Sequence, residues 1–479
     1  MNGAWHLLER HDASQPALEA EDGVVTAGDL RERVARAAAA WIAGRLQPGQ
    51  PVAVKLPDGV DWVVAWLAAI WAGGVAVGVN PRVPADEWRA MLDEAGFAII
   101  VAEAAEDTPA PWQARVVTLD DARRAWAAAT PVPPRPRRHM DPALWVQSSG
   151  TSGRSKAVVH THATLQRIAR ISVERLGLRP EDRLSSSSRL FFTYPLVNVL
   201  LAGLAIGAPV LLDAAWPTAA GFADRVLRQR PSVVFSVPTL YRALLHAGRA
   251  GDFRGLRLCV SAGEALSPSL RRAWQEATGV PMFDGYGCSE TLVLVLGAHD
   301  GDGWLQPSPG VRVRPLDAQA ATAGAPTRLL IEAETLALGY HDRPAAQAES
   351  FRGGALCPAD LFVREGHGWR FAGREDSLIK IGGRWVDLAL VEDRVSSGID
   401  GLREAAAVCV PDADGLDRIV LCYAADDAAA VRDRLLARLA ALPSHQRPSR
   451  LCAVDELPRT ATGKLLRRAL GARLQEDPA

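Results

Sequence analysis

Short runs of β-branched and aromatic residues alternate with longer stretches of helical period along most of the chain, and this alternation restricts the possible folds. PVAVKL (51–56) precedes an apolar segment from Trp62 to Trp71, and LRLCVSAG (256–263) precedes Pro268–Thr278. A strand followed by a helix, repeated, is typical of layered α/β domains. We therefore predict an α/β fold with largely parallel sheets.

The pattern changes character after about Phe371. About 100 residues with strand, helix, strand, strand and helix patterns follow, which suggests a small α+β domain with its own core. A chain of 479 residues is too long for one ordinary domain. We predict a large multi-lobed N-terminal domain over residues 1–375 and a small, mobile C-terminal domain over 376–479. Four prolines and three arginines in residues 131–140 predict an irregular link between two lobes of the large domain.

Charge and apolar patterning exclude two classes of partner. Lys and Arg total 54 and Asp and Glu total 55, so no global positive field exists to hold nucleic acid or an anionic membrane. The apolar run from Val63 to Val79 contains Gly73 and Gly74 and is shorter than the about 20 residues of a membrane span. The N-terminus shows no secretory signal pattern, and the cysteines lack disulfide or zinc spacing. We predict a cytoplasmic enzyme.

The strongest local motif is the loop VQSSGTSGRSK, from Val146 to Lys156, between two apolar segments. Its glycines permit close backbone approach, its hydroxyl groups supply donors and Lys156 adds a cation, which is what the phosphates of a nucleotide need. A flexible surface loop would have a similar composition. The strand-like AVVHTH after Lys156 distinguishes this loop from the Walker loop, which runs directly into a helix.

This loop resembles the signature of the adenylate-forming superfamily of acyl-CoA synthetases, peptide-synthetase adenylation domains and luciferases. Further motifs similar to those of the family occur in the family's order and cover nearly the whole chain: WAGGVAVGVNP (71–81), SAGEAL (261–266), DGYGCSET (284–291), Asp360, GREDSLIKIGGRWV (373–386) and PRTATGK (458–464). The resemblance implies two half-reactions. A carboxylate attacks the α-phosphate of ATP to give an acyl-adenylate and pyrophosphate, and a thiol then displaces AMP.

The resemblance also implies which residues bind the nucleotide. The phosphate loop would contribute Ser148, Ser149, Gly150, Thr151, Ser152, Gly153 and Lys156. The adenine side would be formed by Gly263, Glu264, Ala265, Asp284, Gly285, Tyr286 and Gly287. The ring of Tyr286 offers a stacking face, although a half-buried core tyrosine would look the same in sequence. Asp360 and Arg374 fall on positions that bind the ribose hydroxyls, although a surface ion pair between them would also explain both.

Three residues would carry the first half-reaction according to this resemblance. Ser289 would hydrogen-bond phosphate, and Glu290 would hold Mg²⁺, a hard cation that prefers oxygen ligands. Lys464 matches the lysine that bridges the carboxylate and the α-phosphate. The implied cofactors are ATP, Mg²⁺ and either CoA or the phosphopantetheine of a carrier protein. We expect His160 and His162 to be packed or helix-capping residues rather than bases.

The second half-reaction would use a hinge and a tunnel for the thiol. Asp376 lies at the position of the family's hinge, and Lys380, Gly382 and Gly383 lie where the small domain would swing over the site. Glycine leaves room for a thin pantetheine arm. An exposed glycine turn between two strands would look the same in sequence.

The acid substrate is indicated by the stretch Arg189–Asn198, which contains no acidic residue. Members that activate amino acids place an aspartate there, and burying an unpaired ammonium group would be costly, so an α-amino acid is disfavoured. The pattern F-F-x-Y-x-L-x-N and SAGEAL both resemble benzoate-type aryl-CoA ligases. We expect an aromatic-acid pocket lined by Phe192, Tyr194, Asn198, Ala262 and Gly285. The aromatic residues could instead belong to the core, and a short-chain or fatty acid remains open.

Three departures from the family pattern, at Ser155, Ala359 and Leu390, remove no catalytic charge. The leading prediction is an ATP-dependent aryl-CoA ligase that acts on a small carboxylic acid. The alternative is a free-standing adenylation enzyme that loads an aryl or related acid onto a carrier protein. A catalytically silent protein that keeps the nucleotide site for regulation is a third possibility from a different class.

Overall fold

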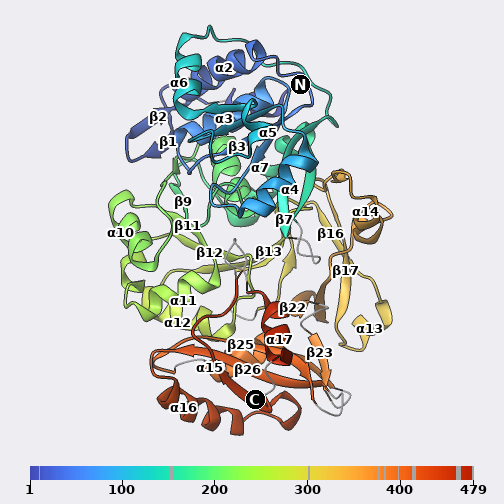
Figure 1. The fold of residues 1–479 in the computed structure, drawn as a ribbon. Coiled ribbons are helices and arrows are strands. Elements are labelled where there is room, and N and C mark those ends of the chain that lie inside the picture. The colour runs from blue at the N-terminus through green and yellow to red at the C-terminus, as the bar shows by residue number, and fades with distance from the viewer. Residues whose placement is uncertain are drawn as a thin grey trace. The chain divides into compact units, whose positions relative to one another are not determined.

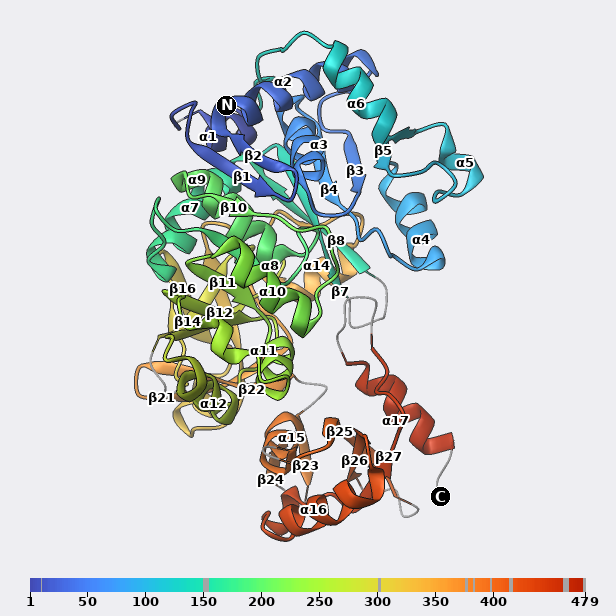
Figure 2. The ribbon, with the colours of Figure 1, turned by 90° about the vertical axis from the view of Figure 1, so that its left-hand side faces the viewer.

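The computed structural model (Figures 1 and 2) describes residues 1–9, 11–149, 155–299, 303–374, 378–381, 384–396, 399–412, 417–459 and 465–476. The chain forms two compact units. The first comprises Met1–Leu266, Leu270–Arg314 and Leu330–Cys357, and the second comprises Ser267–Ser269, Pro315–Leu329 and Pro358–Ala479. The predicted α/β class is confirmed. The domain boundary between 375 and 376 stays a prediction, because residues 375–377 lie outside the described residues.

A nine-stranded sheet in the described part of the first unit is parallel at its centre and antiparallel at both edges. Its strands, in spatial order, are β15 (Gln306–Pro307), β14 (Leu294–Ala298), β13 (Met282–Gly287), β12 (Leu258–Ala262), β11 (Val233–Ser236), β9 (Leu184–Ser186), β10 (Val210–Leu211), β1 (Pro16–Ala20) and β2 (Gly23–Thr26). The parallel strands end at one edge of the sheet, where ligands bind in open α/β folds.

A second sheet, seven-stranded within the described residues, lies in the same unit. Its order is β18 (Gly339–Tyr340), β8 (Ser155–Thr161), β7 (Pro142–Ser149), β4 (Val75–Gly78), β3 (Pro51–Lys55), β5 (Ile99–Ala102) and β6 (Val116–Thr118). The strands from β7 to β6 pair in parallel, whereas β7, β8 and β18 pair antiparallel. The antiparallel edge therefore joins the end of the predicted phosphate loop to β18, which is distant in sequence.

Helices complete the layers. Those of the first unit are α1 (Gly3–Leu8), α2 (Ala27–Ala43), α3 (Val60–Trp71), α4 (Ala85–Ala95), α5 (Ala110–Gln113), α6 (Leu119–Ala128), α7 (His162–Leu176), α8 (Thr193–Pro195), α9 (Ala202–Ile206), α10 (Ala219–Gln229), α11 (Pro238–His246), α12 (Pro268–Thr278, whose first turn belongs to the second unit) and α14 (Pro344–Ser350). Figure 2 shows α2, α3 and α6 gathered beside β3, β4 and β5. Because α3 packs between β3, β4 and α2, it is buried from Trp62 to Trp71, which explains its unbroken apolar sequence. None of the described helices is both long and apolar enough to cross a bilayer.

A third sheet has six strands within the described residues. It contains β16 (Val311–Pro315), β17 (Thr327–Ala333), β19 (Phe351–Arg352), β20 (Ala355–Leu356), β21 (Asp360–Glu365) and β22 (Gly368–Arg374). In the first unit β17 pairs with β20 at Ile331, and in the second unit it pairs with β21 at Thr327 and Arg328. Residues 131–138 form neither helix nor strand, as the prolines predicted.

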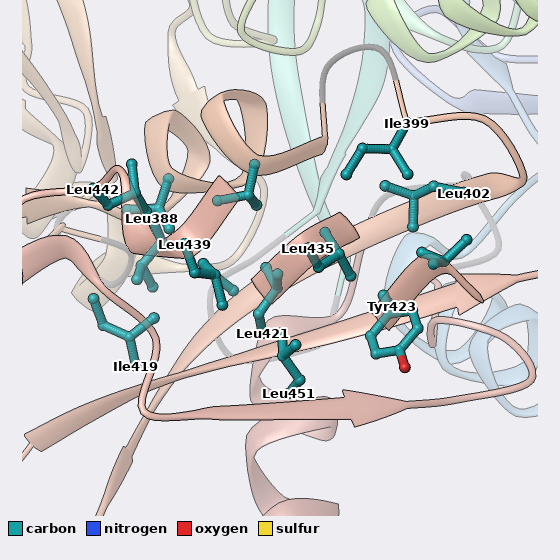
Figure 3. Close-up of a cluster of buried hydrophobic side chains, with 14 of the residues drawn as sticks. Leu388, Ile399, Leu402, Ile419, Leu421, Tyr423, Leu435, Leu439, Leu442 and Leu451 are labelled. Atoms are coloured by element: carbon teal, nitrogen blue, oxygen red, sulfur yellow. The ribbon is translucent and has the colours of Figure 1, made fainter. Parts of the chain in front are cut away.

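The C-terminal part of the second unit is built on a three-stranded sheet of β25 (Leu402–Pro411), β26 (Asp417–Ala425) and β27 (Arg450–Ala453), beside the hairpin of β23 (Leu378–Ile381) and β24 (Arg384–Asp387). The helices of the whole second unit are α13 (Ala318–Thr322), α15 (Leu388–Ser396), α16 (Ala428–Ala440) and α17 (Arg467–Glu476). Side chains alternate between the faces of a strand. Figure 3 shows Leu421 and Tyr423 of β26 packed with Leu435 and Leu439 of α16, whereas Cys422 packs on the other face with Leu470 and Leu474 of α17.

A charged contact fixes α17 to the rest of this unit. Arg467 Nη2 donates to both oxygens of Glu392, at 2.7 and 2.8 Å, and the amide of Ala407 donates to Glu392 Oε1 at 2.6 Å. Only 16% of the Glu392 side chain is exposed, and burial raises the pKa of its carboxyl group. The contact ties α15, β25 and α17 together.

We predict that Arg467→Met lowers the free energy of unfolding of this unit by about 2 kcal/mol, because it leaves a largely buried carboxylate without its cation. Native-state hydrogen exchange at the amides of β25 and β26 measures the local loss. Arg473→Met changes an exposed arginine on the same helix and is expected to cost less than about 0.5 kcal/mol. Equal exchange rates in the two variants would contradict the prediction.

Candidate functional site

The predicted phosphate loop joins two antiparallel strands. Ser148 pairs with Lys156 and Ser149 pairs with Ser155, so β7 and β8 form a hairpin at this point. The prediction that a strand follows the loop is therefore confirmed. The predicted loop residues Gly150, Thr151, Ser152 and Gly153 lie outside the described residues.

A second predicted motif forms the turn between β13 and β14, and its backbone is held from two directions. Three consecutive carbonyl groups each accept a hydrogen bond from a distant segment. The bonds run from His160 Nε2 to Ser289 O at 2.8 Å, from Ala337 N to Glu290 O at 2.9 Å, and from Thr335 Oγ1 to Thr291 O at 2.6 Å. The position of Ser289 and Glu290 therefore depends on β8 and on the segment leading into β18.

The side chain of Ser289 connects this turn to the phosphate-loop hairpin. Its hydroxyl group donates to Gln147 O at 3.5 Å and lies 3.1 Å from Thr193 Oγ1. Gln147 is the residue directly before Ser148 in β7. The structure thus brings the two motifs that were predicted to hold phosphate into direct contact.

Tyr340, which the sequence did not single out, links the two predicted charged groups. Its hydroxyl group donates to Glu290 Oε1 at 2.7 Å, and Lys156 Nζ lies over its ring, 5.0 Å from the centroid. Burial and the nearby Glu290 carboxylate both raise the pKa of Tyr340, so the phenol stays a donor. A carboxylate and an ammonium group therefore meet on the edge and the face of one aromatic ring.

The end of β12 and the end of β13 lie side by side, as expected for the adenine-side motifs. Ala262 pairs with Gly285, and Gly263 has a φ of 86°, a conformation that favours glycine. The Glu264 carboxylate accepts hydrogen bonds from the amide and hydroxyl groups of Thr239, at 3.0 and 2.7 Å. Glu264 is thus engaged at the start of α11, so contacts of this motif to a nucleotide would come from the backbone.

Asp284 to Gly287 form the last residues of β13. Burial raises the pKa of Asp284 to about 6, against the opposing charge of Arg271. Tyr286 is half-buried. A Cβ added to Gly285 would lie 2.7 Å from Leu294 Cδ1, so a larger residue here would require the Leu294 side chain to shift. The predicted flat slot beside Gly285 stays a prediction.

The segment predicted to hold the acid includes an irregular helix. Residues Leu196–Leu201 form a π-helical turn, a feature that is frequent at functional sites. Tyr194 donates its hydroxyl hydrogen to Val260 O at 3.0 Å, and Asn198 Nδ2 donates to Tyr194 O at 3.0 Å. Asn198 is buried, and its Oδ1 has no hydrogen-bond partner among the described residues. Phe192 and Tyr194 are half-buried.

The remaining predicted residues lie in the second unit. Asp360 and Arg374 face each other across β21 and β22, with Arg374 Nε 3.8 Å from Asp360 Oδ1. Lys380 pairs with Trp385 in the β23–β24 hairpin. Asp376, Gly382, Gly383 and Lys464 lie outside the described residues.

The two histidines after the loop are packed residues. His160 is fully buried, and burial lowers its pKa to about 4. His162 begins α7, with Thr161 as its N-cap, and its Nδ1 accepts the amide hydrogen of Gly3 at 3.0 Å. Burial, together with the positive charge of Arg137, lowers its pKa to about 4 as well. Both rings are therefore neutral at pH 7, and neither is placed as a base.

A single carboxylate faces this cluster from the turn, and the described residues contain no group of three His, Cys, Asp or Glu side chains that could hold a metal ion. Mg²⁺ is commonly held by one or two carboxylates together with the phosphates of a substrate. Glu290 fits that mode of binding, in which the nucleotide supplies the other oxygen ligands.

Residues 6–341 match the family model of AMP-binding enzymes. The chain belongs to this family. A 3-hydroxybenzoate–CoA ligase from Aromatoleum sp. (strain CIB) is 35% identical over 488 residues, which cover 95% of this chain and 92% of the relative. The anthranilate CoA ligase AuaEII in complex with anthranoyl-AMP superposes with a TM-score of 0.92 at 26% identity, covering 99% of this chain and 97% of that structure.

A benzoate CoA ligase from Burkholderia xenovorans LB400 superposes with a TM-score of 0.88 at 27% identity, covering 98% of this chain and all of that structure. These three relatives are CoA ligases of aryl acids, in agreement with the family and the activity class predicted from the sequence. The predicted adenylate-forming family is confirmed.

We predict that His160→Gln flattens the pH dependence of stability. An unfolded histidine titrates near pH 6.5, whereas His160 in the folded chain has a pKa of about 4. The unfolded state therefore binds more protons between these values, and stability falls as the pH falls. The contribution of His160 to the free energy of unfolding falls by about 2 kcal/mol between pH 7 and pH 5. Glutamine retains a donor for Ser289 O but does not titrate.

Urea unfolding at pH 7, 6 and 5 measures this difference, with the exposed His246→Gln as the matched control. The parent and the control should lose stability in parallel, while His160→Gln loses about 2 kcal/mol less. Parallel curves for all three proteins would show that His160 is not buried as a neutral ring.

Proposed function

We propose that the chain is an ATP-dependent aryl-CoA ligase that activates an aromatic acid as its acyl-adenylate and transfers the acyl group to CoA. The observation that carries this proposal is the contact between the phosphate-loop hairpin and the Ser289–Glu290 turn, with Lys156 and Glu290 on one tyrosine ring. Phosphoryl-type transfer depends on positioning and charge neutralisation, and this cluster supplies hydroxyl groups, a cation and a carboxylate together.

The roles that we propose for the first half-reaction follow from this cluster. Ser289, Lys156 and the hairpin residues Ser148 and Ser149 would bind the phosphates, with residues 150–153 completing the loop. Glu290 would hold Mg²⁺, which neutralises the charge that develops on the phosphates. Lys464 would stabilise the oxygens of the acid and the α-phosphate in the transition state.

The nucleoside would be held by two further groups of residues. We propose that the backbone of Gly263–Ala265 and of Asp284–Gly287 lies along the adenine, with the half-buried Tyr286 as its stacking face. Asp360 and Arg374 would bind the ribose hydroxyl groups. Arg374 Nε lies 3.8 Å from Asp360 Oδ1, so the carboxylate and the guanidinium group are close enough to act on one ribose together.

An aromatic acid is supported by the chemistry of Arg189–Asn198, which offers aromatic rings and no carboxylate for an ammonium group. Phe192, Tyr194, Asn198 and Ala262 would line or support the pocket. Since the hydroxyl group of Tyr194 is bonded to Val260 O, its ring would contribute an apolar face rather than a donor to the acid. A substituent donor could instead reach the buried Asn198 Oδ1, which has no hydrogen-bond partner in the part of the chain that the structure describes.

CoA as the acceptor is supported by the activity of the relatives, whereas the phosphopantetheine of a carrier protein is the alternative acceptor. Asp376 is the proposed hinge, and Lys380, Gly382 and Gly383 are proposed to line the path of the thiol. A cytoplasmic location stays a prediction.

The decisive test is ATP–pyrophosphate exchange with benzoate, hydroxybenzoates, aminobenzoates, heteroaryl acids and short aliphatic acids, followed by thioester formation with CoA or with a holo-carrier protein. We expect exchange with at least one aryl acid, and thioester formation with CoA. Exchange without transfer to CoA, but with transfer to a carrier, would favour the alternative. Absence of pyrophosphate exchange with every acid would contradict the proposed activity and favour a catalytically silent protein that keeps the nucleotide site for regulation.

We predict that Lys464→Ala lowers the pyrophosphate-exchange rate by about 10² to 10³, because it removes one charge donor from the transition state. Lys380→Ala is the matched control. It removes the same kind of charge from the proposed thiol path and should impair thioester formation more than exchange. Thermal unfolding should be near that of the parent in both. Exchange at the parental rate in Lys464→Ala would remove this residue from the mechanism.

A further inference from the structure

Tyr340 is the residue through which the two predicted charged groups of the site are linked. Its hydroxyl group donates a hydrogen bond to Glu290 Oε1 at 2.7 Å. Lys156 Nζ lies over the face of the same ring, 5.0 Å from its centroid, within the range of a cation–π interaction. The hydroxyl group at the edge of the ring thus contacts Glu290, and the face of the ring contacts Lys156.

The strand register explains why the ring lies there. Tyr340 pairs with Val158 in the antiparallel β18–β8 ladder, so Lys156 is its diagonal neighbour on β8. Diagonal neighbours lie about 7–8 Å apart, within reach of long and aromatic side chains. Leu338 N and His341 N donate to Val159 O and Ala157 O, both at 2.9 Å, which fixes the register on either side of the tyrosine.

Glu290 is fixed to the same segment. Ala337 N donates to Glu290 O at 2.9 Å, three residues before Tyr340. The Tyr340 ring also packs edge-on against Phe351, with the two ring centroids 5.5 Å apart. The amide of Tyr340 donates to Gln347 Oε1 at 2.9 Å. The backbone and the ring of Tyr340 are thus held independently of the hydrogen bond to Glu290.

The Tyr340 side chain contacts the Glu290 carboxylate and the Lys156 ammonium group separately. In the described part of the chain, Lys156 and Glu290 form no direct ion pair within 4.0 Å. A direct ion pair would engage the two groups with each other, whereas their contacts with Tyr340 leave other positions on each group open to a ligand. A carboxylate has about four lone-pair sites, so one bond to Tyr340 leaves the others for a cation.

We propose that Tyr340 is a positioning residue that holds the Glu290 carboxylate for Mg²⁺ and the Lys156 ammonium for the phosphates of ATP. The inference rests on the proposed function for the identity of the ligand. The two contacts of Tyr340 have separate effects on ATP binding. The hydroxyl group would affect the binding of Mg²⁺ through Glu290, and the ring would affect the binding of the phosphates through Lys156.

Two substitutions separate these contacts. Tyr340→Phe removes the hydroxyl group and keeps the ring under Lys156, whereas Tyr340→Leu removes both. Tyr423→Phe is the matched control, since it removes a tyrosine hydroxyl group that donates to Ala428 O at 3.0 Å in the second unit. The full chain is titrated calorimetrically with ATP in excess EDTA and with ATP at a series of Mg²⁺ concentrations.

For Tyr340→Phe we expect a Kd for ATP about tenfold higher than the parent's in Mg²⁺, a higher Mg²⁺ concentration for half-maximal binding, and an unchanged Kd in EDTA. For Tyr340→Leu we expect weaker binding in EDTA as well. Tyr423→Phe should bind as the parent does. In the exchange assay Tyr340→Phe should raise the KM for ATP at low Mg²⁺ more than at saturating Mg²⁺.

Parental Kd values and Mg²⁺ dependence in Tyr340→Phe would overturn the proposal, as would a uniform rise in Kd with and without Mg²⁺. A lower Tm without a change in Mg²⁺ dependence would show a purely structural role. If the parent binds ATP but exchanges pyrophosphate with no acid, the proposed function fails and the test of Tyr340 still holds. If the parent binds no ATP, both fail.

Discussion

Three hydrogen bonds to consecutive carbonyl groups determine the geometry of the candidate site. Thr291 O would be a buried acceptor without a partner if Thr335 did not donate to it, and Ser289 O and Glu290 O are held in the same way by His160 and Ala337. A buried carbonyl group without a donor costs about 1–3 kcal/mol, so the turn has one well-defined position on the two segments. Because β8 also carries the end of the phosphate loop, the same contacts fix the distance between the loop and the turn.

The choice of donors matches the electrostatics of such a site. A protonated histidine would place another positive charge behind a turn that is proposed to hold a metal cation. Since burial lowers the pKa of His160 to about 4, the ring donates its hydrogen bond as a neutral group. The other two donors, Ala337 N and Thr335 Oγ1, are uncharged as well. The charged groups Lys156 and Glu290 are instead half-buried, where a substrate could reach them.

The sequence predicts local features of this fold well, because they depend on neighbouring residues. Pro268–Thr278 is a helix with those bounds, and the strand after Lys156 is present. The sequence also places Ser289 and Lys156 in motifs of one site. It does not identify Tyr340 or Thr193, because their roles come from pairing between segments distant along the chain. The residues LALGYHDRP around Tyr340 contain nothing that specifies pairing with β8, and only the register of β18 puts the ring beside Glu290.

Backbone contacts, packing and an ion pair fix the chain on either side of residues 460–464 to the second unit. Arg459 and Leu465 form an antiparallel bridge, and Leu466 N donates to Pro458 O at 2.8 Å, so the described residues before and after segment 460–464 contact each other. On the C-terminal side α17 begins at once, and Leu470 and Leu474 pack it against the face of the sheet that contains Cys422. Arg467 adds the bond to Glu392 of α15. The described residues that flank the proposed Lys464 are therefore fixed to the packed core of the second unit. For the proposed exchange of groups between the two half-reactions, this attachment means that the second unit would keep its own packing in both.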